Sequence, residues 1–423
     1  MSHSLLLHER NHWLHERLTL MHAYIDAVGN ELTYGHGASN LGESIPRVCS
    51  YLSDVSVAYA SCGGAHTVVL TDNGAVFSMG LNEDGQLGHS AHAQSVPVPQ
   101  EVLLPGPVAQ VATGHHHTLF LTESGNVWAC GRNNQGQLGL GSKAGSHVCT
   151  PQPLNALAGT KIVCLAAGAE HSLAVSASGQ IFSWGCGSNG RLGHAQSSNR
   201  LWFWNRNEAT PRLVQSFTEK AVSVSCGHMH SGCVDSNGRA YTWGYGSYWQ
   251  LGSGKTLDAG LPQQVSDVHG VTRLALGGAH TIALRQTDDL LAWGANQNGV
   301  LGLGSGVSQD ARTPVKVPKL SCSQVSTGWK HSAAIGSHGD LYAWGWGGSV
   351  GTATSFETGK SSGGQLGLGS EFDYWAPTQV TDLQTGGGED QPVQQAPTVP
   401  QIRWRALQVS CGFNHTAAVV TLV

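Results

Sequence analysis

Seven histidines recur in one local pattern, and imidazole is a side chain that serves as metal ligand, acid or base. Each lies three residues after a glycine and directly before Thr or Ser and a short apolar stretch; they are His66, His117, His171, His230, His280, His331 and His415. Separate repeat units hold such copies too far apart to share one metal ion. We therefore expect these histidines to be structural, with ring nitrogens that bond buried backbone groups.

Two further histidines, His115 and His116, precede His117 and stand outside the repeat. Two loop histidines alone make a weak metal site, because tight sites use three or four ligands. The chain also shows no nucleophile-base-acid set, no paired carboxylates and no Gly-rich phosphate loop that opens a helix. We predict no catalytic residue, no metal and no cofactor, and an enzymatic activity is disfavoured.

The elements that carry the histidines repeat with them. Each histidine begins an apolar strand, which is followed by a turn and a second strand that ends at a glycine, as at Gly80, Gly131, Gly185, Gly244, Gly294 and Gly345. A Leu-Gly turn comes next, and these signals together predict one small antiparallel sheet per repeat. Sheets packed radially in a ring bury both faces and protect their edges. Four tryptophans at equivalent positions are expected to pack between neighbouring sheets: Trp184, Trp243, Trp293 and Trp344.

The two ends of the repeat region complement each other. Residues 407–420 carry a Gly-x-x-His strand without a second half, and residues 31–42 carry a second half without a first. Pairing them would close the circle. We predict an all-β fold, a seven-bladed β-propeller over residues 31–423 that is closed by N- and C-terminal strands, with insertions at residues 195–210, 347–364 and 385–400.

Residues 1–30 are predicted to form a short amphipathic helical extension. At about 100° per residue, Leu14, Leu18 and Met21 fall on one apolar stripe. Such a stripe must be buried on the propeller itself or on a partner, and the sequence leaves both open. These three residues are candidates for partner binding.

An aromatic cluster in the insertion at residues 195–210 is a second candidate contact. Trp202, Phe203 and Trp204 lie off the repeat pattern and are flanked by Arg200 and Arg206. Exposed aromatic and Arg side chains are the typical anchors of protein interfaces. The other interpretation is that the insertion folds back and covers a blade edge.

Composition limits the partners and the compartment. The formal net charge is −5 and there is no Lys/Arg-rich run, so the attraction that drives binding to nucleic acid or anionic lipid is missing. No apolar run approaches the roughly 18 residues that span a bilayer. Ten cysteines without a Cys-x-x-Cys pair favour buried thiols in a reducing compartment. We expect an intracellular protein, with the cytoplasm favoured and the nucleus, the cytoskeleton or cilium and the mitochondrion left open.

The repeat from Cys62 to Gly88 reads Gly-x-x-His-Thr, strand, Asp-x-Gly, strand, then Gly-Gln-Leu-Gly. It resembles the repeat of the regulator of chromosome condensation family, and the resemblance covers nearly the whole chain. It implies the propeller fold. It implies less about function, because one fold hosts many activities, and members of that family include the exchange factor for the GTPase Ran, giant ubiquitin ligases and a plant ultraviolet receptor.

The variable slots between Gly and His allow these family functions to be compared. The resemblance implies acidic residues in the second and third slots of the Ran exchange factor, where this chain has His115, His116 and Glu170. It implies Trp in several consecutive slots of the ultraviolet receptor, where this chain has only Trp329. The chain therefore resembles a divergent member of the family.

We predict a non-catalytic protein-protein interaction platform, a subunit or adaptor of a larger intracellular assembly, with Trp329 as a further candidate contact on a propeller face. The alternative is a guanine-nucleotide exchange factor for a small GTPase, which would use His115, His116 and Glu170. In either case the partner is a protein, and neither direct nucleic-acid binding nor membrane insertion is expected.

Overall fold

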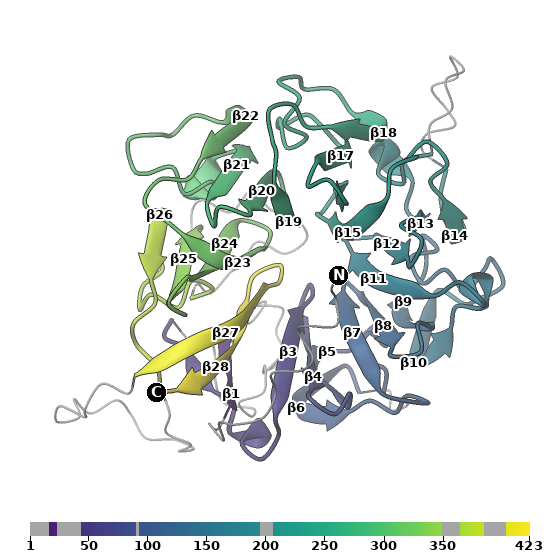
Figure 1. The fold of residues 1–423 in the computed structure, drawn as a ribbon. Helices are drawn as coiled ribbons and strands as arrows, with labels where there is room; N and C mark the ends of the chain where they lie inside the picture. Colours follow the sequence, from purple (N-terminus) through teal and green to yellow (C-terminus); the bar gives the residue numbers. More distant parts are fainter. Residues whose placement is uncertain (1–16, 23–43, 90–92, 195–205, 349–363, 385–402) are drawn as a thin grey trace.

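The structure is a computed structural model that describes residues 17–22, 44–89, 93–194, 206–348, 364–384 and 403–423. In these ranges the strands form antiparallel four-stranded sheets that are arranged radially around a central axis (Figure 1). The architecture is an all-β propeller.

Six blades are each built from four consecutive strands. Blade 1 contains β3 (Val57–Cys62), β4 (His66–Thr71), β5 (Val76–Leu81) and β6 (Ser95–Glu101). Blade 2 contains β7 (Val108–Thr113), β8 (His117–Thr122), β9 (Val127–Arg132) and β10 (His147–Pro153). Blade 3 contains β11 (Ile162–Ala167), β12 (His171–Ser176), β13 (Ile181–Gly185) and β14 (Glu208–Leu213).

The other three blades follow the same order. Blade 4 contains β15 (Ala221–Cys226), β16 (His230–Asp235), β17 (Ala240–Gly244) and β18 (Ala259–Gln264). Blade 5 contains β19 (Val271–Leu276), β20 (His280–Arg285), β21 (Leu290–Gly294) and β22 (Ala311–Lys316). Blade 6 contains β23 (Cys322–Thr327), β24 (His331–Gly336), β25 (Leu341–Gly345) and β26 (Tyr374–Gln379).

One further four-stranded sheet, the closing sheet, joins the two ends of the chain in the order β2-β1-β28-β27. Its strands are β1 (Arg17–His22), β2 (Arg47–Val48), β27 (Trp404–Cys411) and β28 (Thr416–Leu422). β1 pairs with β28 in the register Leu18 to Val420 and Leu20 to Ala418. The ring is thus completed by contacts between residues about 400 positions apart in sequence.

The predicted fold class is wrong in three respects. The structure has six blades of consecutive strands, not seven, and a composite sheet stands between blades 6 and 1. The described residues contain no α-helix, and Arg17–His22, inside the predicted helix, is a strand. The strand that pairs with β28 is β1, whereas residues 31–42, which were expected there, lie outside the described residues.

The physical reason for the strand is the free edge of β28. An unpaired edge strand leaves its backbone N–H and C=O groups without partners, and pairing with β1 satisfies them. The sequence Arg-Leu-Thr-Leu-Met-His also alternates at Leu18 and Leu20, so its apolar residues fit a period of two as well as a helical stripe. The long-range pairing therefore decides a conformation that local periodicity leaves open.

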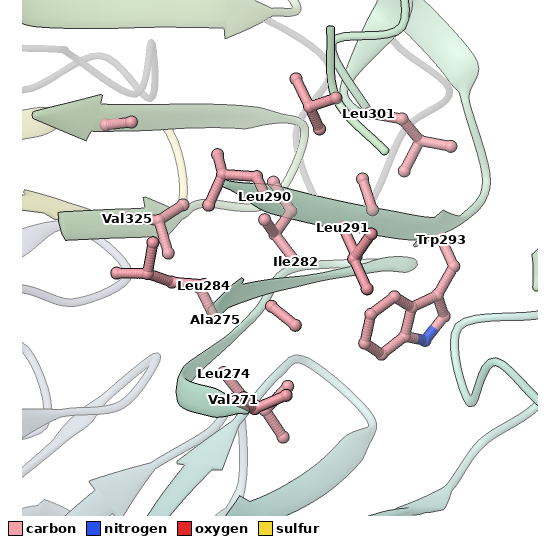
Figure 2. Close-up of a cluster of buried hydrophobic side chains, with 14 of the residues drawn as sticks. Val271, Leu274, Ala275, Ile282, Leu284, Leu290, Leu291, Trp293, Leu301 and Val325 are labelled. Carbon is pink, nitrogen blue, oxygen red and sulfur yellow. The ribbon is translucent and has the colours of Figure 1, made fainter. Parts of the chain in front are cut away.

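The core lies between adjacent sheets and is divided along the ring. The cluster around blade 5 combines side chains of several strands, including Ile282, Leu290 and Trp293 of the blade itself and Val325 of blade 6 (Figure 2). Trp293 is fully buried and its indole Nε1 donates a hydrogen bond to the carbonyl oxygen of Gln250, 2.9 Å away in the preceding blade. Trp184, Trp243 and Trp344 make the same indole hydrogen bond to a carbonyl of the preceding blade. Each of these tryptophans is thus held to the neighbouring blade by apolar packing and by one hydrogen bond.

The repeat histidines form a ring of hydrogen bonds from sheet to sheet. Each is buried, and its Nε2 lies 2.9–3.1 Å from the hydroxyl of the Thr or Ser that follows the histidine of the next sheet. The pairs are His66 to Thr118, His117 to Ser172, His171 to Ser231, His230 to Thr281, His280 to Ser332, His331 to Thr416 and His415 to Thr67. The Nε2 partner is therefore a side-chain hydroxyl and not the backbone group that the sequence led us to expect.

The direction of these bonds places a hydrogen on Nε2 of the imidazole. In six of the pairs the hydroxyl also donates to a backbone carbonyl, as Thr281 does to Gln250 at 2.8 Å. A hydroxyl has one hydrogen, so the histidine Nε2–H must be the donor to it. Burial lowers the pKa of His117, His230 and His280 to about 3 and that of His415 to about 4. These four imidazoles are accordingly uncharged at pH 7, as are His66 and His171, whose pKa burial lowers well below the usual value.

This ring predicts a steep loss of stability in mild acid. Unfolded histidines take up protons near the ordinary pKa of 6.5, whereas the folded ring excludes them until about pH 3 to 4. Stability is complete above pH 6.5 and falls as the pH drops below it, by up to about 1.4 kcal/mol per pH unit for each histidine. Urea unfolding at pH 7, 6 and 5 measures the slope, and His280→Gln should reduce it by up to about 1.4 kcal/mol per pH unit. A wild-type stability that is flat from pH 7 to 5 contradicts the neutral ring.

Candidate functional site: the axial mouth of the propeller

The Gly-x-x-His segments connect the innermost strand of each sheet to the second strand and together form a rim around one end of the axis. Backbone hydrogen bonds join consecutive segments, for example His115 N to Gly168 O at 3.2 Å and Phe413 N to Gly63 O at 2.9 Å. The glycines permit this approach. A Cβ on Gly277 would lie 2.2 Å from Cε1 of His280 and 2.8 Å from the carbonyl oxygen of Gly328, distances that no real side chain allows.

The rim surrounds an open cavity of about 90 Å³, the axial mouth. Four rings contribute to its lining, from blades 2, 4 and 6 and the closing sheet: His115, His228, Trp329 and Phe413. Each of the four is partly exposed. The repeat places these side chains at the first variable position of their segments, so a common backbone geometry directs all of them to the same opening.

The aromatic rings contact one another across the mouth. Trp329 and Phe413 are stacked, with ring centroids 4.5 Å apart and an interplanar angle of 7°. His115 lies 4.8 Å from Phe413 and 6.3 Å from His228. Offset stacking of this kind holds the rings in fixed positions, so the mouth is a preformed aromatic surface.

The mouth is electrically neutral at its centre. Burial lowers the pKa of His115 well below its usual value and that of His228 to about 4, so both imidazoles are uncharged at pH 7. Lys330 lies beside the mouth, with its Nζ 4.4 Å from the Trp329 ring and 5.4 Å from the Trp346 ring. Burial lowers the pKa of Lys330, and the Asp373 carboxylate opposes that effect. The lysine thus sits between two tryptophans as a cation-π contact beside the aromatic surface.

A charged cluster lies next to the mouth, between blades 1 and 2. The buried carboxylate of Asp84 is 2.8 Å from Arg132 Nη2, 3.1 Å from His116 Nδ1 and 2.8 Å from His147 Nδ1. Burial by itself would raise the pKa of Asp84, but the contacts with His116 and Arg132 hold it well below its usual range. Asp84 is therefore an ionised, rigidly held carboxylate.

The structure places the predicted contact residues in several locations. His115 and Trp329 line the mouth, His116 faces Asp84, and Glu170 is a partly exposed residue of the blade 3 segment on the same rim. Leu18 and Met21 belong to β1, and Arg206 is exposed just before β14. The remaining candidates lie outside the described residues: Leu14, Arg200, Trp202, Phe203 and Trp204. Most of the three predicted insertions lies outside them as well.

Sequence reasoning missed His228, Phe413 and the cluster at Asp84. His228 and Phe413 occupy the same repeat position as His115 and Trp329, directly after the glycine of each Gly-x-x-His segment. Comparing that position across the seven segments would have identified the residues of the mouth. No such signal exists for Arg132 and His147, because Asp84 meets them through the packing of two blades.

Within the described ranges there is no group of three His, Cys, Asp or Glu side chains that could hold a metal ion. No helix in those ranges is long and apolar enough to cross a membrane.

The fold and the rim define a β-propeller whose sheets are linked through Gly-x-x-His segments. A family model described as the RCC1-like domain matches residues 27–418. The ultraviolet-B receptor UVR8 of Arabidopsis thaliana is 32% identical over 373 residues, which are 87% of this chain and 79% of that protein. The secretion-regulating guanine nucleotide exchange factor of Mus musculus is 32% identical over 386 residues, 85% of this chain and 75% of that protein. This chain belongs to the RCC1-like propeller family.

Two further comparisons agree with that assignment. The regulator of chromosome condensation of Xenopus laevis is 29% identical over 420 residues, 93% of this chain and 90% of that protein. Yeast RCC1 (Prp20), in its crystal structure bound to Kap60, superposes with a TM-score of 0.78 at 22% identity, covering 96% of this chain and 89% of that one. At that identity the structural likeness concerns the fold.

The rim predicts a sharp difference between two glycine substitutions. Gly277→Ala should lower the free energy of unfolding by at least about 2 kcal/mol, because the methyl group would overlap His280 and the carbonyl of Gly328. Gly306→Ala is the matched control, since an added Cβ there meets no atom within 4 Å, and it should change stability by less than about 0.5 kcal/mol. Urea unfolding of both variants gives the comparison, and equal stabilities would mean that the segments are not closely packed.

Proposed function

We propose that this protein is a non-catalytic interaction platform that receives an apolar or aromatic side chain of a protein partner at the axial mouth. The observation that carries the proposal is the stacked pair Trp329 and Phe413 beside the neutral His115, around an open cavity. Partly exposed aromatic groups that are already fixed in position bind a partner without a large loss of side-chain entropy. The likeness to family members with diverse functions is compatible with this role.

The neutrality of the mouth favours an uncharged anchor on the partner. His115 and His228 are neutral at pH 7 because burial lowers the pKa of each. An apolar group can therefore enter the mouth without removing water from a charged imidazole. The charged groups around Asp84 lie to one side and fit the polar rim that surrounds most interface centres. The partner surface in this proposal is an apolar tip within a polar margin.

Other surfaces extend the same proposal. Leu18 and Met21 of β1 and the aromatic group at Trp202, Phe203 and Trp204 remain proposed contacts, with Arg200 and Arg206 beside the latter. An intracellular location is also part of the proposal. It is supported by ten free cysteines, several of them buried with raised pKa values such as Cys62 and Cys411, as expected in a reducing compartment.

The platform is tested by replacing its aromatic anchors. Trp329→Ala and Phe413→Ala should each weaken binding of the partners by at least about tenfold, since truncation of a central aromatic anchor removes about 2 kcal/mol or more. Leu103→Ala is the control, because Leu103 is 83% exposed and follows the outermost strand of blade 1. Affinity purification from native cells with quantitative mass spectrometry compares the three variants with wild type. Unchanged recovery of every partner with both aromatic variants would show that the partners do not bind at the mouth.

A second candidate function is guanine-nucleotide exchange on a small GTPase. Two relatives carry names that describe exchange or chromosome condensation, and the rim of this chain brings Glu170 to the same end of the propeller as the ionised Asp84 and its partners His116 and Arg132. An exchange factor acts by displacing groups around the nucleotide, so fixed charges on a rigid rim would suit it.

Nucleotide release separates the two candidates. With a platform alone, release of fluorescent GDP from a panel of small GTPases should stay at the intrinsic rate when the protein is added. Acceleration of at least about tenfold that Glu170→Gln abolishes would favour the exchange factor. Glu219→Gln serves as the control, because Glu219 is an exposed carboxylate outside the rim that pairs with Arg239.

A further inference from the structure

A second cavity lies directly beneath the axial mouth, inside the ring of innermost strands. Its volume is about 230 Å³, and it shares lining residues with the mouth, among them Cys62, Thr113 and Cys411. The innermost strands β3, β7, β11, β15, β19, β23 and β27 surround the axis in Figure 1, and each contributes to this central cavity. The cavity is therefore an axial chamber and not a gap between two blades.

The chamber carries one permanent positive charge. Among the described residues that line it, Arg273 of β19 is the one Arg, Lys, His, Asp or Glu. The other titratable groups there are thiols and a phenol, and burial raises the pKa values of Tyr59, Cys164 and Cys226, and to about 12 those of Cys62 and Cys411. They are uncharged at pH 7, so no described residue of the lining carries a negative charge that balances the guanidinium.

Arg273 also lacks a carboxylate partner. Its side chain is exposed to the chamber, and among the described ion pairs of this chain none involves it. Burial raises the pKa of Tyr59 in blade 1 and of Cys164 in blade 3, and the Arg273 guanidinium opposes part of that rise. Its charge therefore acts across the chamber on two other blades.

The surrounding strands add hydroxyl donors. Ser326 Oγ accepts a hydrogen bond from Cys411 N at 2.9 Å, and Ser410 Oγ accepts one from Cys62 N at 3.0 Å. Each hydroxyl also hydrogen-bonds the thiol of the same cysteine. A thiol is a weak acceptor, and a hydroxyl can rotate its hydrogen toward a stronger one. The amide of Gln110, in contrast, is fully engaged with the backbone of Leu165. The chamber thus combines one planar cation with hydroxyl groups that can turn toward an anion, which is the donor set that oxyanions prefer.

We propose that the axial chamber binds a small oxyanion, a phosphate or a short carboxylate, with Arg273 as the principal ligand and the hydroxyls of Ser326, Ser410 and Tyr59 around it. The volume exceeds that of one phosphate ion, so the anion is bound with part of its hydration water. The site is separate from the aromatic mouth, and it does not depend on which partner the mouth binds.

Calorimetry tests the site directly. The full chain is titrated at pH 7 with inorganic phosphate, and in a parallel experiment with malonate, in a buffer of low chloride content. Wild type should bind at least one of the two saturably with one site per chain. Arg273→Gln should weaken that binding at least about tenfold, and Arg273→Lys, which keeps the charge but not the planar fork, should retain part of it.

Arg312→Gln is the matched control, because Arg312 is an arginine of the same blade that lies over the Trp249 ring outside the chamber. It should bind the anion as wild type does. A thermal melt with and without the anion supplies a second readout, since a ligand of the folded state raises the midpoint of wild type and not that of Arg273→Gln. Equal affinity of wild type and Arg273→Gln, or no saturable heat with either anion, would overturn the proposal.

Discussion

The hydrogen bond from each repeat histidine to the hydroxyl of the next sheet is the interaction on which the rest of the structure depends. A single sheet cannot cover its own faces, and packing between sheets alone is not directional. The Nε2–H to hydroxyl contact is directional, it is buried, and it recurs at every junction, including the one from His415 to Thr67 between the closing sheet and blade 1. At six of the seven junctions the hydroxyl donates its own hydrogen to a backbone carbonyl, so each of those junctions orders two sheets and one loop together.

The same geometry produces the candidate site. A histidine can reach the neighbouring sheet only if the segment before it is compact, and the glycine three residues earlier permits this, as Gly277 illustrates. That compact segment leaves its first variable residue facing the axis. The proposed binding site therefore uses positions such as 115, 228, 329 and 413, whose side chains do not take part in the histidine ring. One propeller scaffold can thus carry different sites.

Much of the scaffold could be predicted from the sequence, since the repeat of Gly-x-x-His, paired strands and Leu-Gly turns determines the sheets. The number of contiguous blades and the closing strand could not, because Arg17–His22 fits both a helix and a strand and its partner β28 lies at the other end of the chain. For the site, Trp329 and His115 were found as individual residues. Two contacts could not be predicted: that of Trp329 and His115 with Phe413, and that of Asp84 with Arg132. Both depend on how separate blades are placed in space, and a local sequence pattern does not determine that.

A double-mutant cycle at the junction between the closing sheet and blade 1 tests directly whether the histidine-hydroxyl bond holds neighbouring sheets together. His415→Gln, Thr67→Ala and the double variant are unfolded in urea at pH 7, and the coupling free energy between the two positions is calculated. We expect a coupling free energy of about 1 kcal/mol or more between positions 415 and 67, as for a buried and directional hydrogen bond. Additive effects within about 0.3 kcal/mol would show that the contact is incidental and that packing alone closes the ring.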